Sequence, residues 1–220
     1  MTNMNMELAR RNMVLQQVRP WEVIDDRVLD LMARAPREDY VPAAFRNLAY
    51  VDMNIPLGDG QAMMQPKIEA RLLQELDIQP KDRILEVGTG TGYLTSLLAQ
   101  LGGHVYSVDS KAGYTAAARE RLKAHTIQNV TLETGDALNG WDAHAPYDVI
   151  VVIGSLPAIP EALRAQLARH GRLAAVVGRS PVMEAKLVRR VDGNNFSEVA
   201  LFETDLPRLA NAQDPATFVF

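Results

Sequence analysis

The sequence of 220 residues contains no cysteine. Disulfide bonds, zinc–thiolate sites and a cysteine nucleophile are therefore excluded, and nothing in the chain requires an oxidising compartment. Positive charge is outnumbered as well, because 23 lysines and arginines stand against 27 aspartates and glutamates, for a net charge of −4. This balance argues against nucleic acid as a partner, since binding a polyanion relies on an excess of cationic side chains.

Long apolar runs are also missing. The longest runs, such as residues 149–153, have the length of a strand, whereas a transmembrane helix needs about 20 apolar residues. Residues 1–19 lack the unbroken apolar stretch of a signal peptide. The four histidines are scattered without the paired spacing of metal ligands. We therefore expect a cytoplasmic protein with no membrane partner and no metal.

The middle of the chain, from about residue 82 to 177, alternates short apolar runs with amphipathic segments. The expected strands are residues 83–87, 105–108, 130–133, 147–153 and 172–177. The expected helices are residues 93–101, 112–125 and 160–169. Alternating strands and helices predict a parallel sheet covered on both faces, with right-handed crossovers.

The two flanks differ from this core. Residues 8–18 and 27–35 have helical apolar spacing, whereas residues 37–66 form a loop-rich stretch of a length that is usually functional. Residues 185–191 and 197–203 are predicted to be a closing pair of strands with a turn between them. We expect one domain over residues 1–220, made of an N-terminal cap and loop (1–80), a ligand-binding core (81–180) and C-terminal strands (181–220).

A glycine-rich loop follows the first strand of the core and reads Glu86-Val87-Gly88-Thr89-Gly90-Thr91-Gly92. Glycines let the backbone turn sharply and let a ligand approach the peptide plane, and doubly wound sheets bind ligands at the carboxyl ends of their strands. Asp109 ends the second strand, where an acid can accept hydrogen bonds from ribose hydroxyls. Loop and acid together predict a site for an adenosine-containing cofactor.

The glycine spacing distinguishes among such cofactors. The dinucleotide pattern G-x-G-x-x-G places its third glycine five positions after the first, whereas here the glycines fall at 88, 90 and 92, and the P-loop's G-K-[ST] is missing. The form E-x-G-x-G-x-G resembles motif I of class I S-adenosylmethionine-dependent methyltransferases. Its leading acid, Glu86, suits a ligand that carries positive charge and would repel a pyrophosphate. Gly135-Asp136-Ala137 follows the third strand, where methyltransferases place an acid or amide against the adenine amino group.

Further segments extend this resemblance beyond the core. They are Ala35-Pro36-Arg37-Glu38-Asp39-Tyr40-Val41-Pro42, Ala49-Tyr50, Pro56-Leu57-Gly58, Gly60-Gln61, Gln65-Pro66, Asn129-Val130, Gly140-Trp141, Ala145-Pro146-Tyr147-Asp148 and Ile159-Pro160. With them the chain resembles the protein-L-isoaspartate O-methyltransferase family along most of its length. The resemblance implies an α/β fold: a Rossmann-like, doubly wound and mostly parallel methyltransferase sheet of seven strands, with an N-terminal helical cap and C-terminal strand additions.

The resemblance also implies an activity. The family transfers a methyl group from S-adenosyl-L-methionine to the free carboxylate of L-isoaspartyl or D-aspartyl residues in damaged peptides and proteins, which begins their repair and releases S-adenosyl-L-homocysteine. A carboxylate has an ordinary pKa of about 4 and is ionised at pH 7, so no general base is needed. The residues that the resemblance places against the cofactor are Glu86, Gly88, Thr89, Gly90, Gly92, Asp109, Ser110, Gly135, Asp136 and Ala137.

One segment departs from the family. The family usually reads G-x-G-Q-T-I-S-x-P there, with the serine hydroxyl beside the acceptor carboxylate. In this chain Ala62 replaces the threonine and Met64 replaces the serine at the catalytic position, while Gln61, Met63 and Gln65 complete the substrate loop. A serine installed at position 64 is predicted to raise isoaspartyl activity. The departure leaves alternatives open: a small-molecule or different peptide acceptor, or a non-catalytic cofactor-binding relative.

Overall fold

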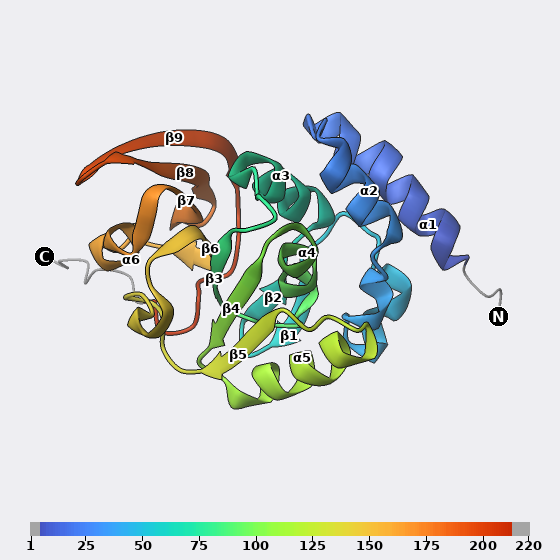
Figure 1. The fold of residues 1–220 in the computed structure, drawn as a ribbon. Helices are drawn as coiled ribbons and strands as arrows, with labels where there is room; N and C mark the ends of the chain where they lie inside the picture. The colour runs from blue at the N-terminus through green and yellow to red at the C-terminus, as the bar shows by residue number, and fades with distance from the viewer. Residues whose placement is uncertain (1–4, 213–220) are drawn as a thin grey trace, which may run out of the picture.

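A seven-stranded sheet runs through the middle of the computed structural model, which describes residues 5–212 (Figure 1). Its strand order is β5-β4-β3-β6-β7-β8-β9. The strands are β3 (Arg83–Val87), β4 (His104–Asp109), β5 (Val130–Thr134), β6 (Tyr147–Leu156), β7 (Leu167–Arg179), β8 (Val182–Asp192) and β9 (Asn195–Thr204). From β5 to β7 neighbouring strands are parallel, and β8 and β9 are added antiparallel. The predicted α/β architecture is confirmed.

Four helices accompany the sheet: α3 (Pro66–Leu76), α4 (Tyr93–Leu101), α5 (Ala112–Ala124) and α6 (Glu161–Ala165). The prediction for α4 was correct and that for α5 was one residue too long. The helix expected over residues 160–169 ends early, because Leu167 already pairs with Tyr147 as part of β7. Helix α3 was not predicted, although Pro66 occupies its first turn, where a missing N–H costs nothing.

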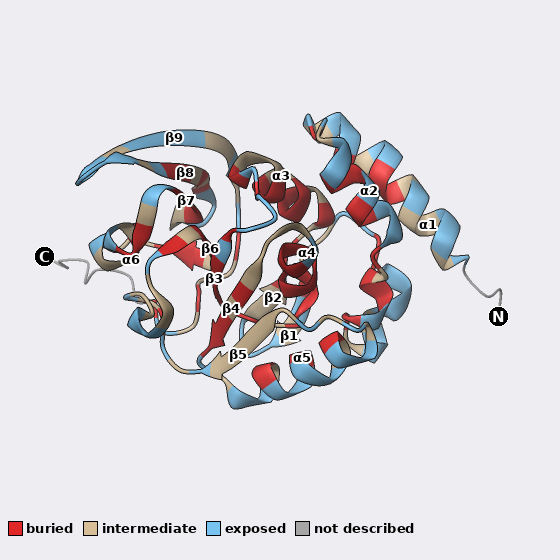
Figure 2. Ribbon diagram, in the orientation of Figure 1, coloured by how far each residue is buried: buried red, intermediate tan, exposed pale blue. Residues whose placement is uncertain are grey.

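Buried residues on the central strands alternate between the two faces of the sheet, as a period of two requires. On β3, Ile84 lies in the apolar cluster beneath α3 and α4, and Leu85 lies in the cluster on the opposite face with Leu163 of α6. On β6, Val149 and Ile150 divide in the same way. Both faces are therefore covered, and most residues of β3 and β6 are buried, whereas β5 at the edge of the sheet is mostly of intermediate burial (Figure 2).

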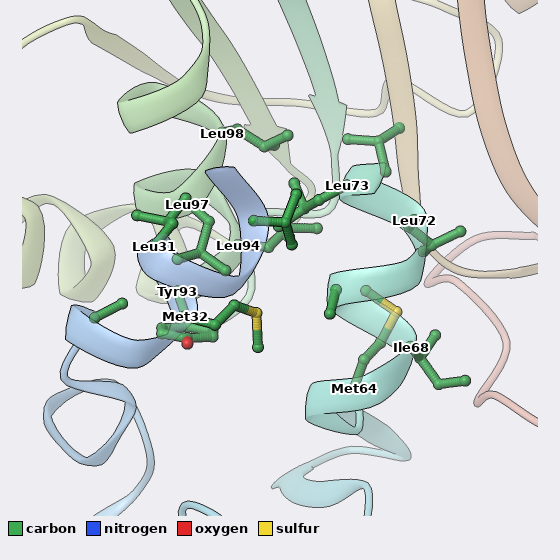
Figure 3. Packing of buried hydrophobic residues seen from close by; sticks show 14 of the residues in the cluster. Leu31, Met32, Met64, Ile68, Leu72, Leu73, Tyr93, Leu94, Leu97 and Leu98 are labelled. Atoms are coloured by element: carbon green, nitrogen blue, oxygen red, sulfur yellow. The ribbon is translucent and has the colours of Figure 1, made fainter. Parts of the chain in front are cut away.

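The N-terminal part is a helical cap beside the sheet (Figure 1). It comprises α1 (Met6–Met13), a π-helical turn (Val14–Val18), a 3-10 turn (Arg19–Trp21), α2 (Asp26–Arg34), and two further 3-10 segments, Arg37–Asp39 and Ala43–Leu48. The chain then forms a hairpin of β1 (Ile55–Gly58) and β2 (Gln61–Met63). The loop expected over residues 37–66 is thus ordered, and α2, α3 and α4 pack through residues such as Leu31, Leu73 and Leu97 (Figure 3).

The predicted closing strands are present as β8 and β9, which continue the central sheet. After β9 the chain turns back along β6, where Ser155 N–H donates to the Pro207 carbonyl (2.9 Å) and Leu209 N–H donates to the Ser155 carbonyl (3.0 Å). The division into regions 1–80, 81–180 and 181–220 stays a prediction, and its residues 1–4 and 213–220 lie outside the described chain. Within residues 5–212 no helix could span a bilayer, and the cytoplasmic location stays a prediction.

Candidate active site

A cavity opens at the carboxyl ends of β3 and β4, beside the point where the strand order reverses between β3 and β6. Doubly wound sheets bind their ligands at such a point. The cavity contains about 530 Å³ of empty space, part of it open to solvent. Its walls are formed by Leu57, Gln61, Ala62, Val87, Gly88, Gly90, Val108, Asp109, Ser110, Lys111, Tyr114, Gly135, Asp136, Ala137, Leu138, Ile153, Leu209 and Ala210.

The glycine-rich loop supplies one wall of the cavity and packs against α5. Gly88 has a left-handed φ of +98°, and a Cβ atom there would lie 3.0 Å from the Ile153 carbonyl oxygen. Gly92 has a φ of +83° and does not line the cavity; its Cβ would lie 2.9 Å from that of Ala118 on α5. The first glycine therefore allows Ile153 and Leu209 to pack closely against the loop, and the last allows α5 to approach the start of α4.

Asp109 ties together the two loops that flank the cavity. It ends β4 and is almost fully buried. One carboxylate oxygen, Oδ2, accepts a hydrogen bond from Gly90 N–H (3.0 Å), and the other, Oδ1, accepts one from Lys111 N–H (2.9 Å). Since each carboxylate oxygen can accept two hydrogen bonds, both retain capacity for a donor in the cavity.

Glu86 lies behind the glycine-rich loop and does not line the cavity. It follows Leu85 on β3, so its side chain points to the face beneath α4, where it is fully buried. Its Oε2 accepts hydrogen bonds from Thr95 Oγ1 (2.5 Å) and Ser107 Oγ (2.6 Å), and Ser107 Oγ also bonds Thr89 Oγ1 (2.6 Å). Burial raises the pKa of Glu86 to about 8. The structure thus places Glu86 and Thr89 in a network that supports the loop.

The far end of the cavity is formed by the segment that follows β5. Asp136 is exposed, and its Oδ1 accepts from Leu138 N–H (2.9 Å) while its Oδ2 accepts from Asn211 Nδ2 (3.3 Å). Gly135 leaves room for the ring of Trp141, since a Cβ would lie 2.6 Å from that ring. Ala137 and the exposed Ser110 line the same end, so the structure brings this predicted group together.

The β1–β2 hairpin forms the opposite wall. Asp59, in the hairpin turn, pairs with Lys111 Nζ at 2.6 Å. Gln61 Nε2 donates to the Arg208 carbonyl at 3.0 Å. These contacts hold Gln61 and Ala62 at the cavity.

The rest of the predicted substrate loop faces elsewhere. Met63, Met64 and Gln65 do not line the cavity. The Met64 side chain is 3% exposed and lies in the apolar cluster near Ile68 on α3 (Figure 3). Its carbonyl oxygen accepts a hydrogen bond from the Arg37 guanidinium. Position 64 therefore contributes a buried side chain and a backbone contact, and its expected catalytic role stays a prediction.

Several lining residues were missed by sequence reasoning. Leu209 and Ala210 carry no local signal, because only the return of the chain along β6 brings them to the cavity. Ile153 lies on β6, at the end of the strand predicted over residues 147–153, so its position could have been inferred. Lys111 and Tyr114 could have been predicted, because they follow Asp109 at the start of a predicted helix.

A family model described as protein-L-isoaspartate(D-aspartate) O-methyltransferase matches residues 9–204. The chain belongs to this family. A protein-L-isoaspartate O-methyltransferase of Klebsiella pneumoniae (strain 342) is 41% identical over 183 residues, which are 83% of this chain and 87% of that protein. The predicted family is confirmed.

Solved structures share the fold. A structure of a protein-L-isoaspartate O-methyltransferase aligns with a TM-score of 0.78 at 22% identity, over 92% of this chain and 66% of that chain. A Plasmodium falciparum protein described in the same family aligns with a TM-score of 0.76 at 20% identity, over 91% of this chain and 97% of that chain. The Plasmodium falciparum protein was solved in complex with S-adenosyl-L-homocysteine.

The cavity residues fit the cofactor that membership of this family implies. Gly88 presents its backbone to the cavity without a side chain, Asp109 keeps acceptor capacity for ribose hydroxyls, and Asp136 stands at the other end. Between residues 5 and 212 no group of three or more His, Cys, Asp or Glu side chains could hold a metal ion.

Proposed function

We propose that the protein is an S-adenosyl-L-methionine-dependent O-methyltransferase that acts on the free carboxylate of L-isoaspartyl and D-aspartyl residues in damaged peptides and proteins. Family membership and the 41% identity to the Klebsiella pneumoniae enzyme support this function. The observation that carries it is the meeting of two walls in one cavity: Gly88 and Asp109 on the side of the sheet, and Gln61 and Ala62 on the side of the hairpin.

The residues of the sheet wall would hold the cofactor. Asp109 would accept hydrogen bonds from the ribose hydroxyls, and Asp136 one from the adenine amino group. Gly88 and Gly90 would present backbone to the rest of the molecule. When bound, S-adenosyl-L-methionine supplies a methyl group made electrophilic by the sulfonium charge.

The hairpin wall would receive the acceptor carboxylate. A carboxylate is ionised at neutral pH, so the chain needs to align the acceptor and exclude water and need not remove a proton. Leu57, Ala62, Ile153 and Leu209 give this side of the cavity an apolar surface. An apolar surface favours a reaction in which an anion and a cation become two neutral molecules, because it solvates the separate charges poorly.

A second acceptor class is favoured by one observation. Ala62 lies on the cavity wall where the family has a threonine, and Met64 buries its side chain where the family has a serine. Neither position offers a side-chain hydroxyl to a carboxylate. A methyltransferase with a more apolar peptide or small-molecule acceptor is therefore the alternative.

A methyl-transfer assay with radiolabelled cofactor tests the proposal. An isoaspartyl peptide and its aspartyl twin are compared, and label is expected in a base-labile ester of the isoaspartyl peptide alone. Calorimetry with S-adenosyl-L-homocysteine is run beside it. Cofactor binding without transfer to the isoaspartyl peptide would support the alternative acceptor, and no cofactor binding would refute methyl transfer itself.

A further inference from the structure

Arg37 is a fully buried cation that does not line the cavity. It follows α2 in the 3-10 segment Arg37–Asp39. Its Nε donates to the Ala49 carbonyl (2.8 Å), Nη1 pairs with the Glu69 carboxylate, and Nη2 donates to the Met64 carbonyl. The guanidinium carbon lies 4.8 Å from the centre of the Tyr93 ring. All three guanidinium nitrogens therefore have partners, and one face of the group lies over an aromatic ring.

These partners come from both sides of the cavity. Met64 follows β2 and is two residues from Ala62 on the hairpin wall. Glu69 lies in the first turn of α3, the helix that follows β2. Tyr93 is the first residue of α4, directly after Gly92 of the glycine-rich loop. Arg37 therefore joins the segment that ends the hairpin to the segment that ends the loop.

The contacts require the shape of an arginine. A guanidinium presents donors in a rigid planar fork and can lie over an aromatic ring at the same time, whereas a lysine ammonium is a compact point charge. The charge of Arg37 is balanced within the core by Glu69, which is 2% exposed. Burial nevertheless raises the pKa of Glu69 to about 7, with Arg37 opposing that rise.

We propose that Arg37 is a positioning residue: through the Met64 carbonyl it fixes the end of the hairpin relative to the glycine-rich loop, and so sets where the acceptor lies relative to the cofactor. The inference rests on the proposed function. The competing explanation is a purely structural ion pair, which apolar residues of similar volume can often replace without loss of stability.

The decisive variant is Arg37→Met with Glu69→Leu, which removes both buried charges together. We expect it to bind S-adenosyl-L-homocysteine with a Kd within about threefold of the native value, because Asp109 and Gly88 are untouched. Its kcat/KM for an isoaspartyl peptide is expected to fall ten- to hundredfold, since small misplacements of reacting groups have effects of this size. Backbone amide exchange over residues 61–65 is expected to become at least about tenfold faster, with exchange in β3 and β4 unchanged.

A matched control is Arg10→Met with Glu38→Leu. This pair also lies in the N-terminal cap, with Arg10 Nη2 3.1 Å from Glu38 Oε1, and contacts Tyr50 instead of the substrate loop. We expect its kcat/KM to stay within about threefold of native. Loss of activity in both double variants to the same extent would assign the effect to general destabilisation and would overturn the proposal.

The single variant Arg37→Lys keeps the charge opposite Glu69 and covers the case in which the double variant does not fold. We expect it to lower kcat/KM at least about fivefold with little change in the Kd of S-adenosyl-L-homocysteine. The positioning role would be refuted if a folded variant, either the double variant or Arg37→Lys, kept the native kcat/KM and the native rate of amide exchange over residues 61–65. The exchange measurement needs no acceptor, so it decides the role of Arg37 even if the native protein does not methylate the isoaspartyl peptide.

Discussion

The two walls of the cavity are built in different ways. The sheet wall consists of strand ends and the loops that follow them, and Asp109 fixes two of those loops through Gly90 and Lys111. The hairpin wall consists of residues from distant parts of the sequence, held by single contacts such as that of Gln61 with the Arg208 carbonyl. In the proposed function, recognition of the cofactor is therefore built into the sheet, whereas recognition of the acceptor depends on segments that pack against it.

The largest effect, a loss of stability, is expected from a substitution behind the hairpin wall. Met64→Ser removes a buried side chain from the apolar cluster, and truncations of that kind cost about 2–5 kcal/mol of stability. Because the side chain packs away from the cavity, we expect no gain in isoaspartyl activity, contrary to the expectation from the sequence. Urea unfolding and kcat/KM on an isoaspartyl peptide measure both effects.

Ala62→Thr is the matched variant on the wall itself. Ala62 is only partly buried, so the free energy of unfolding of the variant should differ from that of the native protein by less than about 1 kcal/mol. The KM for the acceptor should shift. A Met64→Ser protein that is as stable as native and more active would show that position 64 reaches the acceptor after all.

The next largest effect concerns the sheet wall. Asp109→Ala removes the charged acceptor for two backbone N–H groups and, in the proposed function, for the ribose hydroxyls. Hydrogen bonds to a charged group are worth about 1.5–3 kcal/mol, so the Kd of S-adenosyl-L-homocysteine should rise roughly ten- to hundredfold. Asp109→Asn, which keeps an acceptor oxygen, should show a smaller rise in calorimetry. An unchanged Kd in Asp109→Ala would place the cofactor elsewhere.

A further effect, which appears as a dependence of stability on pH, is expected behind the sheet wall, at Glu86. Because burial raises its pKa from 4.5 to about 8, the folded protein keeps a proton that the unfolded chain releases above about pH 4.5. The stabilisation is therefore complete below that pH and is lost as the pH rises toward 8, by about 1.4 kcal/mol per pH unit. Glu86→Gln should flatten the profile of unfolding free energy against pH by that slope between pH 5 and 8.

The exposed Glu7 on α1 provides the control for this measurement. Glu7→Gln removes the same charge at the surface and should leave the slope of the native profile in place. An equally steep profile in Glu86→Gln would mean that Glu86 is ionised in the folded protein.

The sequence predicted the parts of the molecule that depend on local periodicity. Residues 83–87 and 93–101 were predicted with their bounds, and the glycine spacing located the loop between them. The orientation of Glu86 follows from the same period of two, which places it on the face of Ile84 beneath α4 and away from the cavity. Local pattern therefore indicates that Glu86 lies behind the loop, and its predicted part in cofactor binding stays a prediction.

The remaining parts depend on packing between distant residues. The hairpin register, with Ile55 opposite Met63, and the pairing of Ser155 with Arg208 leave no periodic trace in the sequence. The early start of β7 at Leu167 reflects pairing with Tyr147, which overrides helical spacing. The hairpin wall therefore could not be predicted from local patterns in the sequence.

The hydrogen bond between Gln61 and Arg208 joins residues that are 147 positions apart in the sequence. At 5–20 residues per second, a ribosome needs roughly 7–30 s to synthesise that interval. During this time the hairpin has been made, but Leu209 and Ala210, which complete its side of the cavity, have not. A nascent chain therefore carries an unfinished hairpin side of the cavity until almost the whole described chain has been synthesised.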